Sequence, residues 1–294
     1  MAIIITKAPA KINPVLEVLS KRDDGYHELS LIFQTIELHD VLQFDGAVNG
    51  VSLEIPGAPE GLAQDDSNLI LKAAKLFLRE YPSRKGVRII LEKNIPVAAG
   101  LGGGSSDAAV TLLAFDALFD TRLKMDTLEK LAGQLGSDVP FFLRGGTALG
   151  TGRGEKITPL PAAPELHLVL VKPPKGLSTP AVYQSGKAQF TNGERTRQFL
   201  GLLRERNPAY IAGSLFNGLE PATFFLMPEV EALKRQLLEG GATAALVSGS
   251  GPTVFGVART AEEAAALGRK MDNGGNQVWV TKTISADFKD RNKS

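Results

Sequence analysis

Residues 94–109 read Asn-Ile-Pro-Val-Ala-Ala-Gly-Leu-Gly-Gly-Gly-Ser-Ser-Asp-Ala-Ala, and the expected architecture of the chain is organised around this stretch. A run rich in β-branched residues, from Val87 to Leu91, precedes it. Apolar residues at helical spacing follow it from Ala108 to Phe115. The sequence therefore predicts a strand, a glycine-rich loop and a helix in this order.

The glycine-rich loop is suited to binding a polyphosphate. Glycine accepts positive φ and carries no Cβ, so a ligand can approach the main chain, and the unpaired N–H groups of a helix start attract an anion. Neither common phosphate fingerprint matches, because no Lys-Ser or Lys-Thr follows the glycines and the G-x-G-x-x-G spacing is broken. A flexible glycine turn capped by Ser or Asp is the structural alternative. The predicted phosphate-binding residues are Gly100, Leu101, Gly102, Gly103, Gly104, Ser105 and Ser106.

Three blocks of the sequence resemble the GHMP kinase family, which includes galactokinase, homoserine kinase, mevalonate kinase and phosphomevalonate kinase. Residues 96–109 resemble its central phosphate-binding motif. Residues 9–13 together with 22–28 near the start, and residues 248–253 near the end, agree with it in the family's order. The resemblance covers nearly the whole chain.

This resemblance implies an α+β fold with two domains and an active site in the cleft between them. The N-terminal domain, expected over residues 1–160, would have a mixed sheet like domain 2 of ribosomal protein S5. The C-terminal domain, over residues 161–294, would be ferredoxin-like. The proline-rich segment 158–164 favours a boundary there, because prolines interrupt strand pairing.

Periodicity alone predicts only alternating strands and helices. We expect separate strands at residues 3–5, 12–19 and 29–44, with a charged turn at 21–25, and a capped helix at 68–81. The further expectations are strands at 51–55, 166–171 and 277–284, strand pairs at 145–157 and 244–257, and helices at 126–135, 179–185, 193–206, 228–239 and 261–271.

Composition and charge argue against a nucleic-acid or membrane partner and limit the kind of metal site. The 294 residues carry 33 basic and 32 acidic side chains and a net charge of +1, which gives no electrostatic case for a nucleic-acid or membrane partner. No apolar run approaches the roughly 20 residues of a membrane span, so we expect a soluble, cytoplasmic protein. With no cysteine and three scattered histidines, any metal should be bound by oxygen.

Two residues are candidates for the chemistry of phosphoryl transfer, in which a protein mainly positions groups and stabilises charge. Asp138 lies between a glycine turn and an apolar segment, and its structural alternative is a cap or turn residue. Lys11 lies in an apolar context, where a lysine ordinarily extends its amine to solvent. The resemblance implies that Lys11 pairs with Asp138, with Asn13 holding the pair or the substrate. Whether Asp138 removes the proton or orients the hydroxyl stays open.

An aromatic residue beside an imidazole can stack on a base and hydrogen-bond its edge. Tyr26 and His27 form such a pair, although a lone histidine is more often structural. The resemblance implies that both read a cytosine, with Tyr183 as the opposing aromatic wall and Thr179 as a further substrate-binding residue. Asn68 and Pro96 resemble positions near the adenine of ATP.

The favoured function is ATP- and Mg²⁺-dependent phosphorylation of the C2 hydroxyl of a cytidylyl sugar-alcohol diphosphate, in the non-mevalonate isoprenoid pathway, by a monomer or homodimer. Its alternatives are a GHMP kinase of the mevalonate or homoserine type, and a non-catalytic nucleotide-binding protein on the same fold. The ligands of the metal stay unassigned. One departure is Gly218, which stands where the family usually has aspartate, and which puts local contacts of the second domain in doubt.

Overall fold

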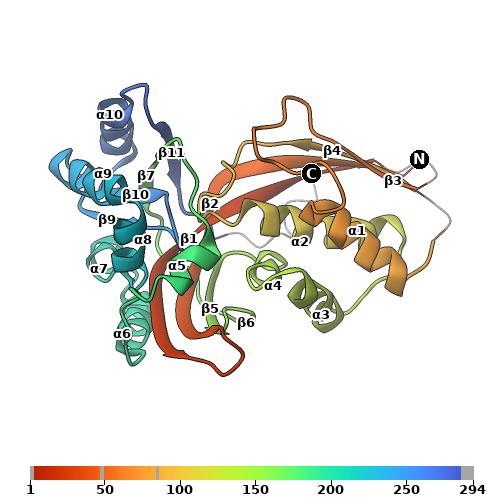
Figure 1. The fold of residues 1–294 in the computed structure, drawn as a ribbon, viewed down its shortest axis with the longest axis horizontal. Coiled ribbons are helices and arrows are strands. Elements are labelled where there is room, and N and C mark those ends of the chain that lie inside the picture. Colours follow the sequence, from red (N-terminus) through yellow and green to blue (C-terminus); the bar gives the residue numbers. More distant parts are fainter. Residues whose placement is uncertain (1–2, 47–49, 84–85, 286–294) are drawn as a thin grey trace.

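The computed structural model describes residues 3–46, 50–83 and 86–285, which fold around two sheets (Figure 1). The first sheet is mixed, because β3 pairs with β4 and β1 with β8 in parallel while its other pairs are antiparallel. Its path is β3(Val51–Glu54), β4(Val87–Glu92), β2(His27–Asp45), β1(Ile3–Lys21) and β8(Phe216–Asn217), with β5(Thr147–Gly152) on β2 and β6(Lys156–Pro159) on β5.

The spine of this sheet is the long hairpin of β1 and β2, paired from Ile3 opposite Asp45 to Lys21 opposite His27. The prediction of two separate strands at 3–5 and 12–19 was wrong, because β1 runs unbroken through Pro9. The register shifts between Pro9 and Lys11, and such a bulge tolerates a residue that has no N–H to donate. The bulged segment also brings the amine of Lys11 towards the glycine loop.

Four helices form the layer beside the first sheet: α1(Leu69–Glu80), α2(Gly103–Leu118), α3(Met125–Leu135) and α4(Val139–Phe142) (Figure 1). The central one is α2, whose residues Ser106 to Leu112 are all buried. It packs on α1 through Phe115, which meets Phe77 edge-on with ring centroids 5.8 Å apart. The predicted helices at 68–81 and 126–135 are confirmed, whereas α4 was missed because four residues carry no helical period.

The second sheet is antiparallel, in the order β11(Gln277–Lys282), β7(His167–Lys172), β10(Val254–Ala258) and β9(Ala244–Val247). The helices α9(Pro228–Glu239) and α10(Ala261–Met271) pack on it around Val169, Val171 and Leu237. A further cluster of buried residues joins the two sheets, because Ile12 and Ile32 of the first pack with Leu170 and Phe255 of the second. The predicted strands and helices of this half are confirmed.

Between β7 and β9, the chain adds elements that the sequence did not predict. They are α7(Pro208–Gly213), α8(Glu220–Leu226) and the two-residue β8, beside the predicted α5(Thr179–Gln184) and α6(Glu194–Leu202), which a 3₁₀ turn continues to Glu205. The chain passes from the first sheet to the second between Pro159 and His167, but β8 lies in the first sheet again. The boundary at residue 160 therefore stays a prediction.

Gly218 follows β8 where the backbone packs closely. Its N–H donates to the carbonyl of Leu16 at 2.8 Å, and its carbonyl accepts from the N–H of Gln189 at 2.7 Å. A Cβ on Gly218 would lie 2.8 Å from the carbonyl oxygen of Gln189. Glycine at this position is thus required by the close approach of two backbone segments.

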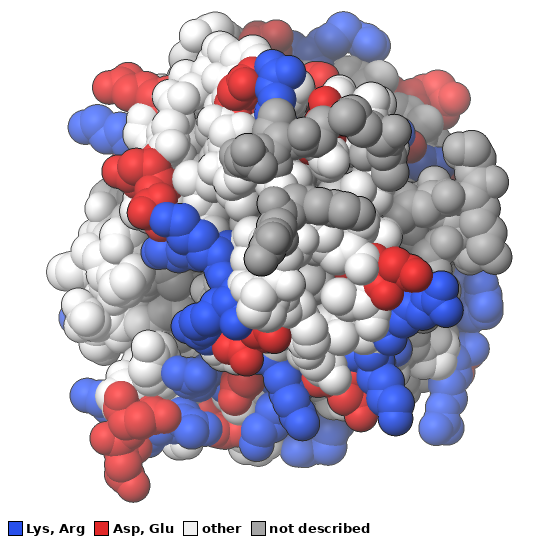
Figure 2. All heavy atoms as spheres, turned by 90° about the vertical axis from the view of Figure 1, so that its right-hand side faces the viewer, with Lys and Arg blue, Asp and Glu red and all other residues white. Residues whose placement is uncertain are grey.

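The outer surface carries mixed charge. Figure 2 shows acidic and basic side chains close together on the face that it displays. Bridges such as Arg88 to Glu54, at 2.7 Å, and Lys75 to Asp66, at 2.5 Å, are exposed pairs that contribute little to stability. None of the helices in the described ranges has the length and apolar character needed to cross a bilayer.

Candidate active site

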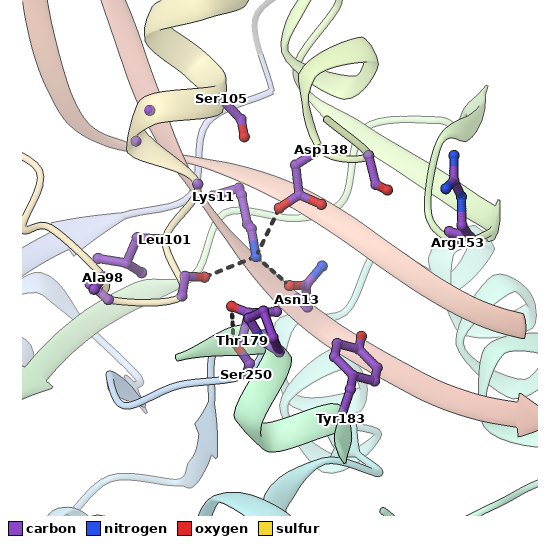
Figure 3. Close-up of a pocket in the computed structure, with 18 of the residues that line it drawn as sticks. Lys11, Asn13, Ala98, Leu101, Ser105, Asp138, Arg153, Thr179, Tyr183 and Ser250 are labelled. Carbon is purple, nitrogen blue, oxygen red and sulfur yellow. Dashed lines mark hydrogen bonds and ion pairs between the residues drawn. The ribbon is translucent and has the colours of Figure 1, made fainter. Parts of the chain in front are cut away.

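A cavity of about 870 Å³ opens between the glycine loop, β1 and α5 (Figure 3). It reaches from Pro96 and Leu69 at one end to Tyr26 and His27 at the other. The loop between β9 and β10 closes one wall with Gly249 and Ser250. The cavity therefore brings together segments from both sheets, as expected for a cleft.

The glycine loop owes its shape to two glycines. Gly100 and Gly102 have φ of +74° and +73°. Gly103 already begins α2, so among the four glycines of the loop only Gly100 and Gly102 have positive φ. A Cβ on Gly100 would lie 2.2 Å from the carbonyl oxygen of Ser248, and a Cβ on Gly102 would lie 2.8 Å from the ring of Phe142. Gly102, the cap residue of α2, makes no side-chain hydrogen bond to the start of the helix, and Gly103, Gly104 and Ser105 of the first turn line the cavity.

Lys11 lies at the centre of the cavity wall (Figure 3). Its Nζ donates to Oδ1 of Asn13 at 2.7 Å and to the carbonyl of Gly100 at 2.9 Å, and it lies 3.7 Å from Oδ2 of Asp138. The side chain is only 4% exposed, which excludes the solvent-directed alternative. Burial lowers the pKa of Lys11, and the charge of Asp138 opposes that shift.

Asp138 stands at the start of α4 but does not cap it through its side chain. Its carboxylate points towards Lys11 across the cavity and is 35% exposed (Figure 3). Asp138 thus occupies the cap position in a turn, as the structural alternative has it, but its side chain is not used to cap the helix. A carboxylate with an ammonium partner and an open side towards a cavity can meet a substrate hydroxyl.

Aromatic side chains line the far end of the cavity. The rings of His27 and Tyr183 lie 5.2 Å apart at 30°, and the guanidinium of Arg153 lies 4.6 Å from the ring centroid of Tyr26. Burial raises the pKa of Tyr183, and the nearby charge of Asp138 adds to that rise. Burial also lowers the pKa of His27, with Lys21 contributing, which favours the neutral imidazole. The predicted base-binding residues thus share one end of the cavity.

The two halves of the chain meet through short polar contacts at the cavity. Oγ1 of Thr179, at the start of α5, lies 2.7 Å from Oγ of Ser250 (Figure 3). Oγ of Ser248 donates to the carbonyl of Gly100 at 3.0 Å. The predicted glycine turn at residues 248–253 is confirmed as the β9–β10 hairpin loop and lines the cavity.

All the predicted site residues line this cavity except Asn68 and Ser106. The side chain of Asn68 caps α1, where Oδ1 accepts from the N–H of Ile70 at 2.9 Å and Nδ2 donates to the carbonyl of Ala63 at 2.6 Å. Ser106 is fully buried, and its hydroxyl has no hydrogen-bond partner. The structure therefore gives neither side chain a free face towards a nucleotide.

Three charged residues of the cavity were not predicted as site residues, and one of them, Asp24, lies in the charged turn before Tyr26. Arg153 follows β5 in a glycine-rich turn, and Lys93 follows β4 just before the glycine loop. The sequence could have indicated Lys93, because it is a basic residue directly before the predicted phosphate-binding loop. For Arg153 the only signal is its place among Gly150, Gly152 and Gly154, which indicates an exposed turn.

The expected magnesium ion has no cluster of protein ligands in the described part of the chain. The described residues hold no group of three or more His, Cys, Asp or Glu side chains that could bind a metal. Magnesium usually keeps few protein ligands and is bound largely through substrate phosphates. Ser105, in the first turn of α2 on the cavity wall, has a hydroxyl that fits that sparse arrangement.

The cavity combines a glycine loop suited to phosphates, a lysine–aspartate pair and an aromatic end that could bind a second substrate. A small-molecule kinase needs such parts to align an acceptor hydroxyl with a phosphate. Residues 68–146 match the family model for the GHMP kinases N terminal domain, and residues 199–277 match that for the GHMP kinases C terminal domain. The chain belongs to the GHMP kinase family, whose members use ATP.

Two relatives by sequence and one solved structure to which this chain is similar are the same kinase. The 4-diphosphocytidyl-2-C-methyl-D-erythritol kinase of Pelotomaculum thermopropionicum is 45% identical over 285 residues, which cover 96% of this chain and 99% of the relative. That of Moorella thermoacetica is 45% identical over 289 residues, covering 97% and 100%. A crystal structure of 4-(cytidine 5'-diphospho)-2C-methyl-D-erythritol kinase matches with a TM-score of 0.80 and 35% identity over 96% of this chain and 100% of that one.

Proposed function

We propose that this chain transfers the γ-phosphate of ATP to the C2 hydroxyl of 4-diphosphocytidyl-2-C-methyl-D-erythritol. The observation that supports this most is the place of the Lys11–Asp138 pair, between the glycine loop and the aromatic end of one cavity. A kinase needs its acceptor hydroxyl in line with the phosphate that it transfers. The assignment of the acceptor follows from the relatives of this chain.

In this proposal the carboxylate of Asp138 receives the hydrogen bond of the acceptor hydroxyl, either orienting it or taking its proton. Lys11 stabilises negative charge on the acceptor oxygen. Its amine is fixed by Asn13 and by the carbonyl of Gly100, so it needs little rearrangement during the reaction. Nδ2 of Asn13 in turn donates to the carbonyl of Ile32 at 3.1 Å, which anchors the group to β2.

The triphosphate would lie along the glycine loop, on the first N–H groups of α2. Pro96 and Leu69 border the same end of the cavity and leave apolar surface for the adenine. A magnesium ion, when bound, neutralises phosphate charge there, and Ser105 is the hydroxyl placed to help hold it.

The cytosine would stack at the other end, on Tyr26 and against Tyr183, with His27 beside it. Arg153, stacked on Tyr26, would face the diphosphate that links the cytidine to the sugar alcohol. Arginine suits that role because its guanidinium binds phosphate oxygens in pairs. The predicted oligomeric state, a monomer or homodimer, and a cytoplasmic location stay predictions.

The test is ADP release from ATP and Mg²⁺ with the cytidylyl substrate, mevalonate, homoserine or galactose as acceptor. We expect turnover with the cytidylyl substrate alone. Stimulation by mevalonate or homoserine alone would support the alternative kinases. ATP binding without turnover on any acceptor would support a non-catalytic protein, and either result would overturn the proposal.

A further inference from the structure

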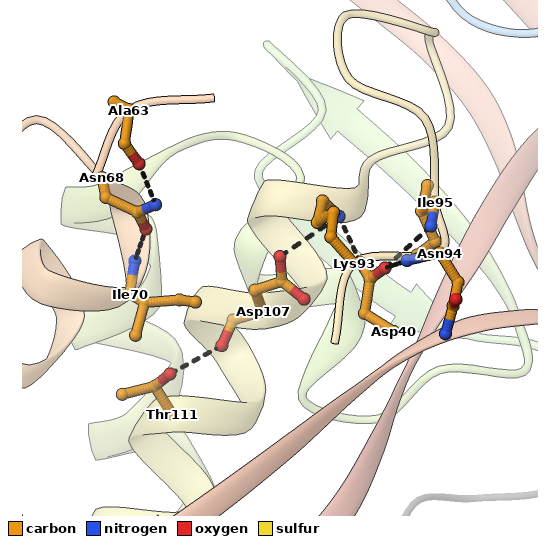
Figure 4. Close-up of polar contacts among 9 residues, drawn as sticks. All are labelled: Asp40, Ala63, Asn68, Ile70, Lys93, Asn94, Ile95, Asp107 and Thr111. Atoms are coloured by element: carbon orange, nitrogen blue, oxygen red, sulfur yellow. Dashed lines mark hydrogen bonds and ion pairs between the residues drawn. The ribbon is translucent and has the colours of Figure 1, made fainter. Parts of the chain in front are cut away.

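Three charged residues that the proposed function does not use lie buried beneath the glycine loop (Figure 4). They are Asp40 on β2, Lys93 after β4 and Asp107 on α2, whose side chains are 0%, 4% and 3% exposed. Charged side chains are seldom buried so completely without a specific role.

Asp40 binds the segment that leads into the glycine loop. Oδ1 of Asp40 accepts from the backbone N–H groups of Asn94 and Ile95, at 2.6 and 2.7 Å. Those residues begin the segment that leads to the glycines. A carboxylate with two backbone donors fixes the direction in which this segment leaves the sheet.

Lys93 connects Asp40 to the start of α2, where the glycine loop ends. Nζ of Lys93 pairs closely with Asp40 and lies 3.4 Å from Oδ2 of Asp107, which follows the first turn of α2 (Figure 4). A Cβ on Gly103 would lie 2.8 Å from the same Nζ, so the amine lies directly against the start of the helix. One lysine therefore links both ends of the phosphate loop.

The cluster has two carboxyl groups for one ammonium. Lys93 contacts Asp40 more closely than Asp107, and Oδ1 of Asp107 is buried without any hydrogen-bond partner. Burial raises the pKa of Asp107 well above its ordinary range, and Asp40 adds to that rise while Lys93 opposes it. Asp40 and Lys93 are the charged groups that act on Asp107 among the described residues.

We propose that Asp40, Lys93 and Asp107 form a buried clamp that positions the phosphate loop for ATP, in which Asp107 is the neutral, protonated member. A neutral Asp107 leaves the clamp without net charge, whereas its ionised form would place one net negative charge under the polyphosphate site. All three are positioning residues. The role in binding ATP rests on the proposed function.

The neutral state is tested by comparing Asp107→Asn with the wild type in urea unfolding between pH 5 and pH 9. Folded Asp107 retains a proton that the unfolded chain releases above about pH 3.9. Its raised pKa therefore stabilises the fold at low pH, and that contribution is lost as pH rises towards the folded-state pKa. Relative to the asparagine variant, the folding equilibrium constant of the wild type should fall as pH rises, by up to about tenfold per pH unit until the folded-state pKa is reached. Parallel pH curves would overturn the proposal.

The positioning role is tested by Lys93→Met, with Asp116→Asn as the matched control. Asp116, at the other end of α2, accepts from the hydroxyl of Thr121 at 2.7 Å and the N–H of Leu123 at 2.8 Å, so its loss weakens the helix away from the loop. Lys93→Met should weaken ATP in a direct titration by roughly 10- to 100-fold, because small displacements of a positioned group have effects of that order. The affinity for the cytidylyl substrate should change by less than about threefold, since the clamp touches one end of the cavity only.

The control should lower the unfolding midpoint and leave both affinities unchanged. Equal weakening of both ligands in Lys93→Met, or wild-type affinity for ATP, would overturn the clamp. If Lys93→Met does not fold, the double variant Lys93→Met/Asp40→Asn, which also removes the buried carboxylate that Lys93 pairs with, takes its place with the same expected loss. Failure of the wild type to bind ATP would instead contradict the proposed function, and the pH comparison would still test the neutral Asp107.

Discussion

Replacement of Gly100 by alanine should separate the two loops that meet at the cavity. The added Cβ would lie 2.2 Å from the carbonyl oxygen of Ser248 and 2.9 Å from that of Gly251, and neither is a flexible side-chain end that could move aside. Gly100 also has a φ of +74°, which L residues adopt at a cost of about 1–2 kcal/mol. Overpacking of a tight contact costs about 1–3 kcal/mol more. We therefore expect Gly100→Ala to lose about 2–5 kcal/mol of stability.

The matched control is Gly104→Ala in the same loop. Gly104 lies in the first turn of α2 with an ordinary φ, and its Cβ would meet only Leu69, at 3.4 Å. Alanine in a helix is favoured over glycine by about 0.5–1 kcal/mol, so this variant should be as stable as the wild type or more so. The two variants are compared by urea unfolding, with the midpoint and slope fitted for each.

Activity gives a second measurement on Gly100→Ala. The carbonyl of Gly100 accepts from both Lys11 and Ser248, so a displaced residue 100 should also reduce kcat in the fraction that remains folded. A Gly100→Ala variant within about 0.5 kcal/mol of the wild type, the range of ordinary surface substitutions, would refute the reasoning. It would mean that the glycine loop and the β9–β10 loop can separate without loss of stability, and that their contact does not stabilise the fold.

Three further predictions concern the chemistry and the acceptor end. Asp138→Asn should lower kcat by about 10²–10⁴-fold while ATP still binds, and a variant that keeps a tenth of the activity would remove Asp138 from the mechanism. Tyr26→Ala should weaken the cytidylyl substrate by roughly 5- to 150-fold, as expected for one lost base stack, with ATP affinity unchanged in a parallel titration. The rate should fall at alkaline pH as Lys11 loses its proton, and because burial lowers its pKa the fall should begin below the ordinary value of about 10.4. Lys11→Arg should move this limb of the pH profile upward, and an unmoved limb would assign it to another group.

Much of the site could be predicted because its residues lie in contiguous blocks. The glycine loop and the start of α2 form one uninterrupted segment, so local rules about φ and helix starts suffice. Lys11 and Asp138 are far apart in the chain, and only the family resemblance indicated that they pair. The structure brings them within 3.7 Å.

The remainder could not be predicted because the relevant contacts are tertiary. Asp40 occupies a strand position, and nothing near it indicates that its carboxylate accepts from the N–H groups of Asn94 and Ile95. Arg153 gains meaning only from the ring of Tyr26 across the cavity. β8 has two residues and therefore no periodicity to detect.

The pairing of β1 with β8 bears on how the chain is made. Val15 lies opposite Phe216, and the carbonyl of Leu16 accepts from the N–H of Gly218, so this edge of β1 is completed by residues from late in the chain. At 5–20 residues per second, a ribosome needs roughly 10–40 s to synthesise the intervening segment. During that interval a long hairpin presents an open edge, the kind of surface on which chains associate wrongly. We therefore expect the edge of β1 at Val15 and Leu16 to lack its β8 partner until residues 216–217 have been synthesised.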